Sequence, residues 1–138
     1  FGDPETQPVM LRLQSDLVDL VEAAIDGRLD TTGAQWDPRP SLGVVMAAAP
    51  YPDTPRTGDV IAGLDDVPAM AKVFHAGTAL DAEGRVVSAG GRVLCVAALG
   101  ESVSDAQRNA YAGVAKVRWT NEFHRTDIGW RAIARERG

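Results

Sequence analysis

Two apolar runs, Ser41–Ala49 and Arg92–Leu99, place the strongest constraint on how this chain folds. Each run is short, and the first lies between prolines. Short apolar runs with such boundaries are typical of buried β-strands. Shorter segments of the same character lie between the two runs. These segments are Asp59–Ile61, Lys72–His75, Thr78–Leu80 and Val86–Ser88, with turn sequences at 81–84 and 89–91. The pattern predicts a small, curled antiparallel sheet.

The first part of the chain has a helical period instead. Apolar residues recur at spacings of three and four between Met10 and Ile25, which predicts one face of an amphipathic helix. Ser15 is a candidate N-cap that would divide this stretch into two helices. Gly27 follows the last apolar residue, in the position where a left-handed residue ends many helices.

Two loop segments separate the regular elements. Residues 30–40 carry turn-forming residues and mark a boundary between the helical segment and a β-rich domain. Residues 50–58 hold three prolines, and each proline lacks the donor that a strand ladder needs. A helical period returns at 103–117, with Ser104 and Gln107 as a predicted capping box. Residues 130–135 predict a terminal turn of helix, so the fold class is α+β.

Composition excludes several classes of function. The 138 residues carry a net charge of −5 with scattered basic residues, so the chain lacks the basic surface of a nucleic-acid-binding protein. No apolar stretch approaches the roughly 20 residues of a membrane span, and no signal sequence opens the chain, which predicts a cytoplasmic protein. A single cysteine, Cys95, excludes an internal disulfide framework. We expect its thiol to be buried in the core.

The residue types that several kinds of catalysis require are sparse. The only histidines, His75 and His124, lie far apart and lack the nearby His or Cys partners of a zinc site. No G-x-S-x-G motif occurs, although a Ser–His–Asp arrangement that forms only in space stays open. The segment Ala89–Arg92 contains two glycines but lacks the Lys-Ser/Thr of a P-loop, which favours a hairpin turn.

The segment Phe1–Gln7, with the sequence FGDPETQ, carries the strongest local signal. One interpretation is structural: Asp3 caps a helix, Pro4 takes its first position and Glu5 favours the positive end of the helix dipole. The other interpretation is functional. Two carboxylates and an amide at a turn can bind an ammonium group or orient cationic neighbours. The residues alone leave both interpretations open.

Several motifs follow one another along nearly the whole chain. They are FGDPETQPV (1–9), SDL (15–17), YP with GDVI and a glycine (51–63), VFHAGT (73–78), GGRVL (90–94), ALG (98–100), AY (110–111) and DIGWRA (127–132). In this order they resemble the glycinamide ribonucleotide synthetases, also called phosphoribosylamine–glycine ligases. One segment departs from the family pattern. Many relatives carry Gly-Gly before Tyr-Pro, where this chain has Ala49-Pro50, so the resemblance assigns no close backbone approach to this loop.

The resemblance implies an ATP-grasp ligase of purine biosynthesis. Such enzymes join glycine to 5-phosphoribosylamine through a glycyl phosphate, with ATP as substrate and Mg²⁺ or Mn²⁺ as cofactor. By the same resemblance, residues 1–29 are the C-terminal end of the ATP-grasp domain and residues 30–40 are a linker. Residues 41–138 are expected to form a small antiparallel, barrel-like β domain with flanking helices. The family's metal ligands and most of its ATP site correspond to positions upstream of Phe1.

The resemblance also implies where the chain would meet substrates. The expected substrate-binding residues at the rim of the site are Gly2, Asp3, Pro4, Glu5 and Gln7. We expect them to face glycine and 5-phosphoribosylamine, with Asp3 or Glu5 pairing with the glycine ammonium group. No residue of the chain is expected to be catalytic or to bind metal.

Three further residues, His75, Gly77 and Thr78, are expected to approach the same cleft, although packing alone would also account for their motif. Because the sequence opens inside an active-site motif, we expect a portion of a longer enzyme, inactive without the N-terminal portion of that enzyme. The competing hypothesis is a β-rich binding module that keeps the ligase scaffold and does no chemistry. A related ATP-grasp carboxylase is a third, weaker hypothesis.

Overall fold

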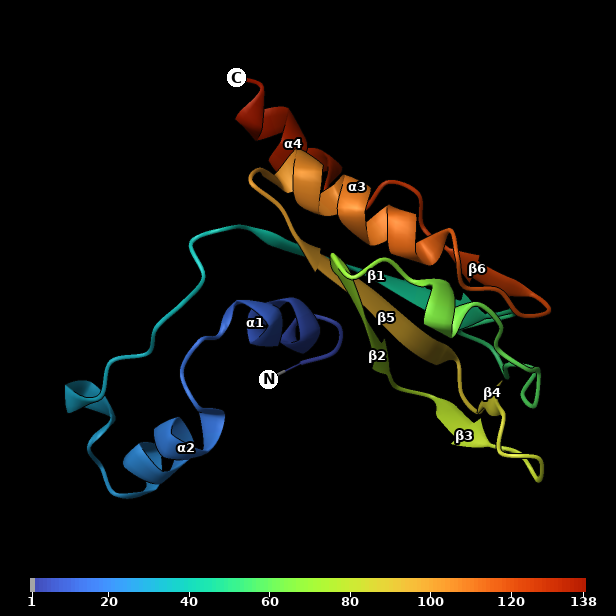
Figure 1. Cartoon of the computed structure of the whole chain (residues 1–138), viewed down its shortest axis with the longest axis horizontal. Helices are drawn as coiled ribbons and strands as arrows, with labels where there is room; N and C mark the ends of the chain where they lie inside the picture. Colours follow the sequence, from blue (N-terminus) through green and yellow to red (C-terminus); the bar gives the residue numbers. More distant parts are fainter. Residues whose placement is uncertain (1) are drawn as a thin grey trace.

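The computed structural model describes residues 2–138 and combines helices with antiparallel strands (Figure 1). Its helices are α1 (Thr6–Arg12), α2 (Leu17–Ile25), α3 (Val103–Val114) and α4 (Trp130–Glu136), with short 3₁₀ helices at Leu29–Thr31 and Leu64–Asp66. Its strands are β1 (Ser41–Ala48), β2 (Ala71–His75), β3 (Thr78–Leu80), β4 (Val86–Ser88), β5 (Arg92–Leu99) and β6 (Glu122–His124). The predicted α+β class is confirmed. Within the described range, no helix is long and apolar enough to cross a membrane.

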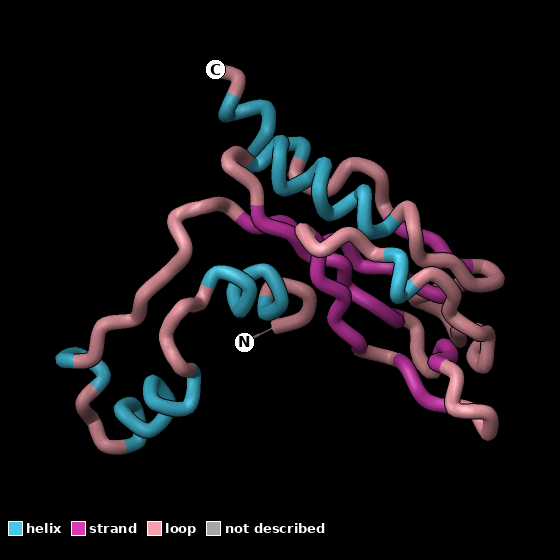
Figure 2. The backbone as a smooth tube through the Cα atoms, viewed as in Figure 1, coloured by secondary structure: helices cyan, strands magenta, loops and turns pink. Residues whose placement is uncertain are grey.

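Strand β5 lies inside an antiparallel sheet whose strand order is β2-β5-β1-β6. Strand β1 pairs along nearly all of β5, with Val44 opposite Val96, and β2 pairs with the other side of β5. The two apolar runs of the sequence are therefore neighbours in the interior of the sheet. Figure 2 shows them as adjacent strands beneath the long helix α3.

The hydrophobic core lies between α3 and the side of the sheet that faces it. Successive residues of a strand point to opposite faces, so alternate residues of β1 and β5 share this core. Its most deeply buried large side chains are Met46, Leu94, Val44, Val93, Val96, Val114 and Val117. The apolar face predicted for the second helical stretch is confirmed, because Ala106 and Ala110 of α3 are also fully buried.

The sheet is open, and the barrel-like form expected from the family resemblance is wrong. Strands β2 and β6 form its opposite edges, and no ladder joins them among the described residues. A closed barrel requires such a pairing and about eight strands in small examples. Here α3 covers the core face instead. Strands β3 and β4 pair in a separate hairpin, and the strand predicted at 59–61 is reduced to a single bridge between Val60 and Val87.

Helix α1 packs on the other face of the sheet, against β1 and β5 (Figure 1). Gly43 makes this contact possible, because a Cβ atom there would lie 3.0 Å from both Pro8 Cγ and Cys95 Sγ. The hydroxyl of Ser41 donates a hydrogen bond of 2.7 Å to the carbonyl of Pro8. Helix α1 is thereby held against the start of β1, although the two lie far apart in sequence.

The helical stretch predicted between Met10 and Ile25 is divided, as expected, into two helices. The cap differs from the prediction: Asp16 accepts a 2.7 Å hydrogen bond from Val18 N, whereas the Ser15 hydroxyl accepts one from Gln35 N. The predicted helix end is confirmed by Gly27, whose φ is +67°. In Figure 1, α2 lies away from the sheet.

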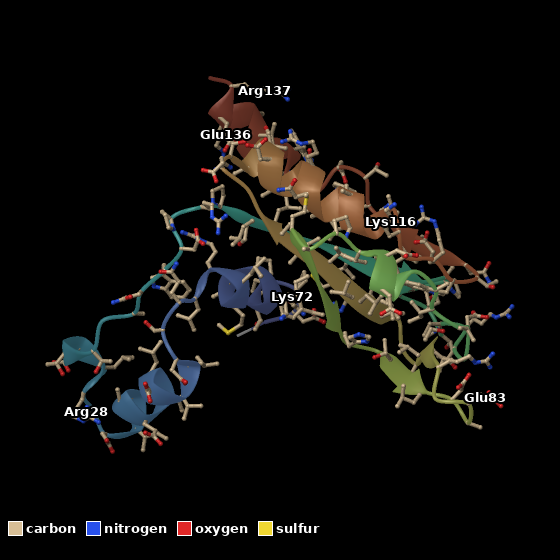
Figure 3. The ribbon with its side chains drawn as sticks, in the orientation of Figure 1. Arg28, Lys72, Glu83, Lys116, Glu136 and Arg137 are labelled. Atoms are coloured by element: carbon tan, nitrogen blue, oxygen red, sulfur yellow. The ribbon has the colours of Figure 1, made fainter. Side chains whose placement is uncertain are left out.

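The N-cap of helix α3 lies two residues before the predicted one. Ser102, not Ser104, accepts the capping hydrogen bond, at 3.0 Å from Asp105 N. The carboxylate of Glu136 from α4 satisfies two further amides at this end, those of Val103 at 2.6 Å and Ser104 at 3.2 Å. Figure 3 shows Glu136 at the junction of the two helices. A remote acid thus takes the role that a local capping box was predicted to have.

An ion pair anchors the long loop that leads into β1. The carbonyl of Asp37 accepts hydrogen bonds of 3.1 and 3.0 Å from the guanidinium of Arg12, and its carboxylate accepts one of 2.7 Å from Arg39. The hydrogen bonds from the Arg39 side chain and then its backbone amide lower the pKa of Asp37 from 3.8 to about 2. A carboxylate with a lowered pKa stabilises the folded state only while it is ionised.

The Asp37→Asn variant is expected to lose stability at neutral pH and to converge with the parent in acid. Because the folded pKa of about 2 lies below the ordinary value of 3.8, the stabilising contribution is complete above about pH 4. It is lost as the pH falls from about 4 to about 2. Urea unfolding at several pH values measures this difference, with the exposed Asp30→Asn as control. A difference between Asp37→Asn and the parent that stays constant down to pH 2 would contradict the assignment.

Candidate functional site

Four segments that are distant in sequence meet at one end of the sheet. The turn before α1 supplies Asp3, and Arg92 Nε at the start of β5 lies 2.9 Å from Asp3 Oδ2 in an ion pair. Arg92 Nη1 donates a 3.2 Å hydrogen bond to the hydroxyl of Tyr51. The amide of Gly77 donates a 3.0 Å hydrogen bond to the Arg92 carbonyl. We call Asp3, Gln7, Tyr51 and Arg92 the rim cluster.

The carboxylate of Asp3 does not cap a helix, so the capping role predicted for this residue is wrong. Helix α1 begins at Thr6, and Glu5 stands at the cap position without a side-chain capping bond. Asp3 Oδ2 instead pairs with Arg92, and Asp3 Oδ1 accepts a long hydrogen bond of 3.5 Å from Gln7 Nε2. The turn therefore orients a cationic neighbour, which is one of the two roles that the functional interpretation allowed.

The other residues of the turn surround Asp3. Pro4 precedes the cap position and so does not occupy the first position of the helix. The carboxylate of Glu5 folds back over Gly2, against the space that a Cβ atom there would occupy. Gln7 Oε1 is buried, and nothing in residues 2–138 donates a hydrogen bond to it. Phe1, the first residue of the motif, lies outside the described residues.

The VFHAGT motif reaches the rim cluster through its backbone. A Cβ atom on Gly77 would lie 2.8 Å from both the Arg92 carbonyl oxygen and Gly90 Cα, so only glycine permits this approach. His75 Nδ1, at the end of β2, lies 3.1 Å from the hydroxyl of Thr78, at the start of β3. Of the three predicted cleft residues, Gly77 thus contacts the segment of Arg92, whereas His75 and Thr78 pair with each other.

The rim cluster is open to solvent. The side chains of Asp3 and Arg92 are 42% and 43% exposed. A separate hollow of about 510 Å³ lies at the other end of β5, beside Lys72 and Asp105. Lys72, labelled in Figure 3, extends from β2 near α1. The motif residues at 2–7 line an exposed edge, a geometry that fits the rim of a larger site.

The described residues do not fit a metal centre. Across 2–138, no group of three or more acidic, His or Cys side chains could hold a metal ion. We therefore derive no reaction step through Mg²⁺ or Mn²⁺ from this chain.

The single thiol is poorly suited to act as a nucleophile. Cys95 is buried as predicted, and burial raises its pKa to about 11, with a smaller contribution from the negative charge of Asp3. A thiol with such a pKa stays protonated at neutral pH and is a weak nucleophile.

Sequence reasoning missed Arg92 and Tyr51 as members of the site. Both lie inside motifs that carried the family resemblance, yet neither has a partner nearby in sequence. The available signal was the position of Arg92, a charged residue that directly follows two glycines and begins a strand predicted to be buried. Only the fold shows that this arginine reaches the turn before α1.

Comparison with known proteins places the chain among ligase sequences. The family model described as "Phosphoribosylglycinamide synthetase, C domain" matches residues 41–131. A phosphoribosylamine–glycine ligase from Xanthomonas axonopodis pv. citri is 80% identical over 137 residues, which cover 99% of this chain and 32% of the relative. The ligase of the same name from Pseudomonas syringae pv. tomato is 63% identical over 139 residues, covering 100% of this chain and 32% of that one.

A solved structure has the same fold. The crystal structure of phosphoribosylamine–glycine ligase from Thermotoga maritima matches with a TM-score of 0.72 and 32% sequence identity. The match covers 92% of this chain and 31% of the Thermotoga chain. The chain thus spans about a third of the length of the curated relatives and of the solved structure that it matches.

Proposed function

The chain belongs to the family of phosphoribosylglycinamide synthetase C domains, and from this premise we propose that it is the C-terminal portion of a phosphoribosylamine–glycine ligase. The observation that carries the proposal is the 80% identity with the Xanthomonas ligase along 99% of the chain.

The proposed reaction is the ATP-dependent joining of glycine to 5-phosphoribosylamine. The carboxylate of glycine attacks the γ-phosphorus of ATP, which releases ADP and gives glycyl phosphate. The amine of 5-phosphoribosylamine then attacks the acyl carbon, phosphate leaves, and the nitrogen loses a proton. We assign ATP and the metal, Mg²⁺ or Mn²⁺, mainly to the upstream portion of the enzyme, since residues 2–138 offer no metal-binding cluster.

In this proposal the turn before α1 forms the substrate-facing rim. Two acceptors suit an ammonium group: Asp3 Oδ1 in this turn, and the buried Gln7 Oε1 at the start of α1, which lacks a donor within the described chain. A buried acceptor without a partner costs free energy, so a donor from the substrate would relieve that cost. Gly2, Pro4 and Glu5 complete the turn that we propose to face glycine and 5-phosphoribosylamine.

The N-terminal helices are proposed to belong with the upstream portion of the ligase. We assign residues 1–29 to the end of the ATP-grasp domain, 30–40 to a linker and 41–138 to the C-terminal domain. Large apolar side chains on the first segment support this division, since Val18 is 63% and Ile25 79% exposed. Exposed apolar surface of this kind marks a protein interface. We propose a cytoplasmic enzyme without nucleic-acid or membrane partners.

A chimaera tests the proposed function. Here "the intact ligase" means this chain joined to the upstream portion of the Xanthomonas ligase, in place of that enzyme's own C-terminal third. We expect glycine-dependent ADP formation with 5-phosphoribosylamine within about tenfold of the parental rate, a cost below about 1.4 kcal/mol in barrier. The upstream portion alone is the control. A folded but inactive chimaera would favour the binding module that does no chemistry.

A further inference from the structure

Arg92 makes contacts to several segments at once. Its Nε lies 2.9 Å from Asp3 Oδ2, in the turn before α1. Its Nη1 donates to the hydroxyl of Tyr51, in the loop after β1, and its Cζ lies 5.9 Å from the centre of the tyrosine ring. A guanidinium that stacks on an aromatic ring and also binds its hydroxyl is restricted to few orientations.

The tyrosine that holds Arg92 is itself fixed by its surroundings. A Cβ atom on Gly91 would overlap Tyr51 Cδ2, so the ring packs directly on the backbone of the residue before Arg92. The amide of Tyr51 donates a 3.0 Å hydrogen bond to the Ala48 carbonyl at the end of β1. The ring of Tyr51 thus packs on Gly91, and the backbone of Tyr51 is hydrogen-bonded to the end of β1.

The backbone of Arg92 is equally constrained. It pairs with Ala47 across the β1–β5 ladder, and its carbonyl accepts the hydrogen bond from the amide of Gly77. The first residue of a strand is often loosely held, whereas this one is bonded to neighbours on both sides. The sheet therefore fixes the position of the Arg92 side chain beside the turn before α1.

We propose that Arg92 is a positioning residue for Asp3. The inference rests on the proposed function and deepens it. By occupying Asp3 Oδ2, the guanidinium fixes the plane of the carboxylate, so that Oδ1 points toward Gln7 and the glycine ammonium group. Arg92 acts through Asp3 and does not contact the substrate. The C-terminal domain thereby sets the affinity for glycine although the acceptor belongs to the segment before it.

Substitutions of Arg92 in the intact ligase test this role. Arg92→Met keeps the aliphatic length but removes the charge, and we expect the KM for glycine to rise about tenfold or more. The KM values for ATP and 5-phosphoribosylamine are expected to stay within about threefold. Arg92→Lys should recover part of the glycine affinity, because it retains the charge without the planar fork. The double variant Arg92→Met/Asp3→Asn should have the same KM for glycine as Asp3→Asn alone, because the two residues act as one unit.

A matched control is Arg85→Met, in the hairpin between β3 and β4. Arg85 is also an exposed arginine in ion pairs, with Asp81 and Glu83, but it lies outside the rim cluster. The kinetic constants of the Arg85→Met variant are expected to equal those of the unsubstituted intact ligase. Thermal unfolding of each variant separates a loss of stability from a change in glycine KM.

Three results would overturn the inference while leaving the proposed function in place. One is an active ligase in which Arg92→Met and Arg85→Met behave alike. The second is a rise in the KM for 5-phosphoribosylamine instead of glycine, which would make Arg92 a direct ligand of the substrate phosphate. The third is a double variant in which the effects of Arg92→Met and Asp3→Asn on the KM for glycine add. If the unsubstituted intact ligase is inactive, the proposed function itself fails.

Discussion

Replacing Asp3 with Asn in the intact ligase is expected to raise the KM for glycine about 10–100-fold while the KM for ATP stays within about threefold. Asparagine has nearly the same shape but carries no charge, and a charge-assisted hydrogen bond is about twice as strong as a neutral one. The ion pair with Arg92 would also be lost, so the amide would no longer be held in one plane. Steady-state kinetics with each substrate varied in turn measures the effect.

The control for this variant is Asp65→Asn, at an exposed acid in the 3₁₀ helix Leu64–Asp66. It removes the same charge from the chain at a place remote from the rim cluster. Equal increases in the KM values for glycine and ATP in Asp3→Asn would point to a general disturbance of the site. That result would contradict the assignment of Asp3 to the glycine ammonium group.

The sheet and most helices could be predicted from sequence because their signals are local. The apolar runs that became β1 and β5 and the buried face of α3 were recognisable from periodicity alone. The caps were harder, since Ser15 and Asp16 are adjacent residues of similar capping preference. At the start of α3, two further amides are satisfied by Glu136, more than 30 residues later in the chain. Local patterns do not encode such remote partners.

The open sheet and the rim cluster could not be predicted either, because both depend on contacts between residues far apart in sequence. Whether edge strands close into a barrel depends on strand tilt and on what covers the core, neither of which periodicity reports. The motif at 1–7 was identified, but its partner Arg92 was not, because an ion pair between residues so far apart appears only when the chain has folded. The close approach of Gly77 to Gly90 likewise required the three-dimensional structure.

In the proposed division, the rim cluster combines residues of both domains. Its acceptor, Asp3, belongs to the segment assigned to the ATP-grasp domain, and Arg92 belongs to the C-terminal domain. If the proposed role of Asp3 holds, neither portion alone contains a complete site for glycine. The exposed apolar residues of α2, such as Val18 and Ile25, supply a surface through which the upstream portion could bind this chain without a covalent link.

The measurement that tests the account most directly is ADP formation dependent on glycine, with 5-phosphoribosylamine, ATP and Mg²⁺. It is made on this chain, on the separate upstream portion of the Xanthomonas ligase, and on their mixture. We expect activity only in the mixture, because the chain supplies the rim and the upstream portion the nucleotide site. Activity from the 138 residues alone would contradict this division. So would an inactive mixture in which both portions are folded and associated.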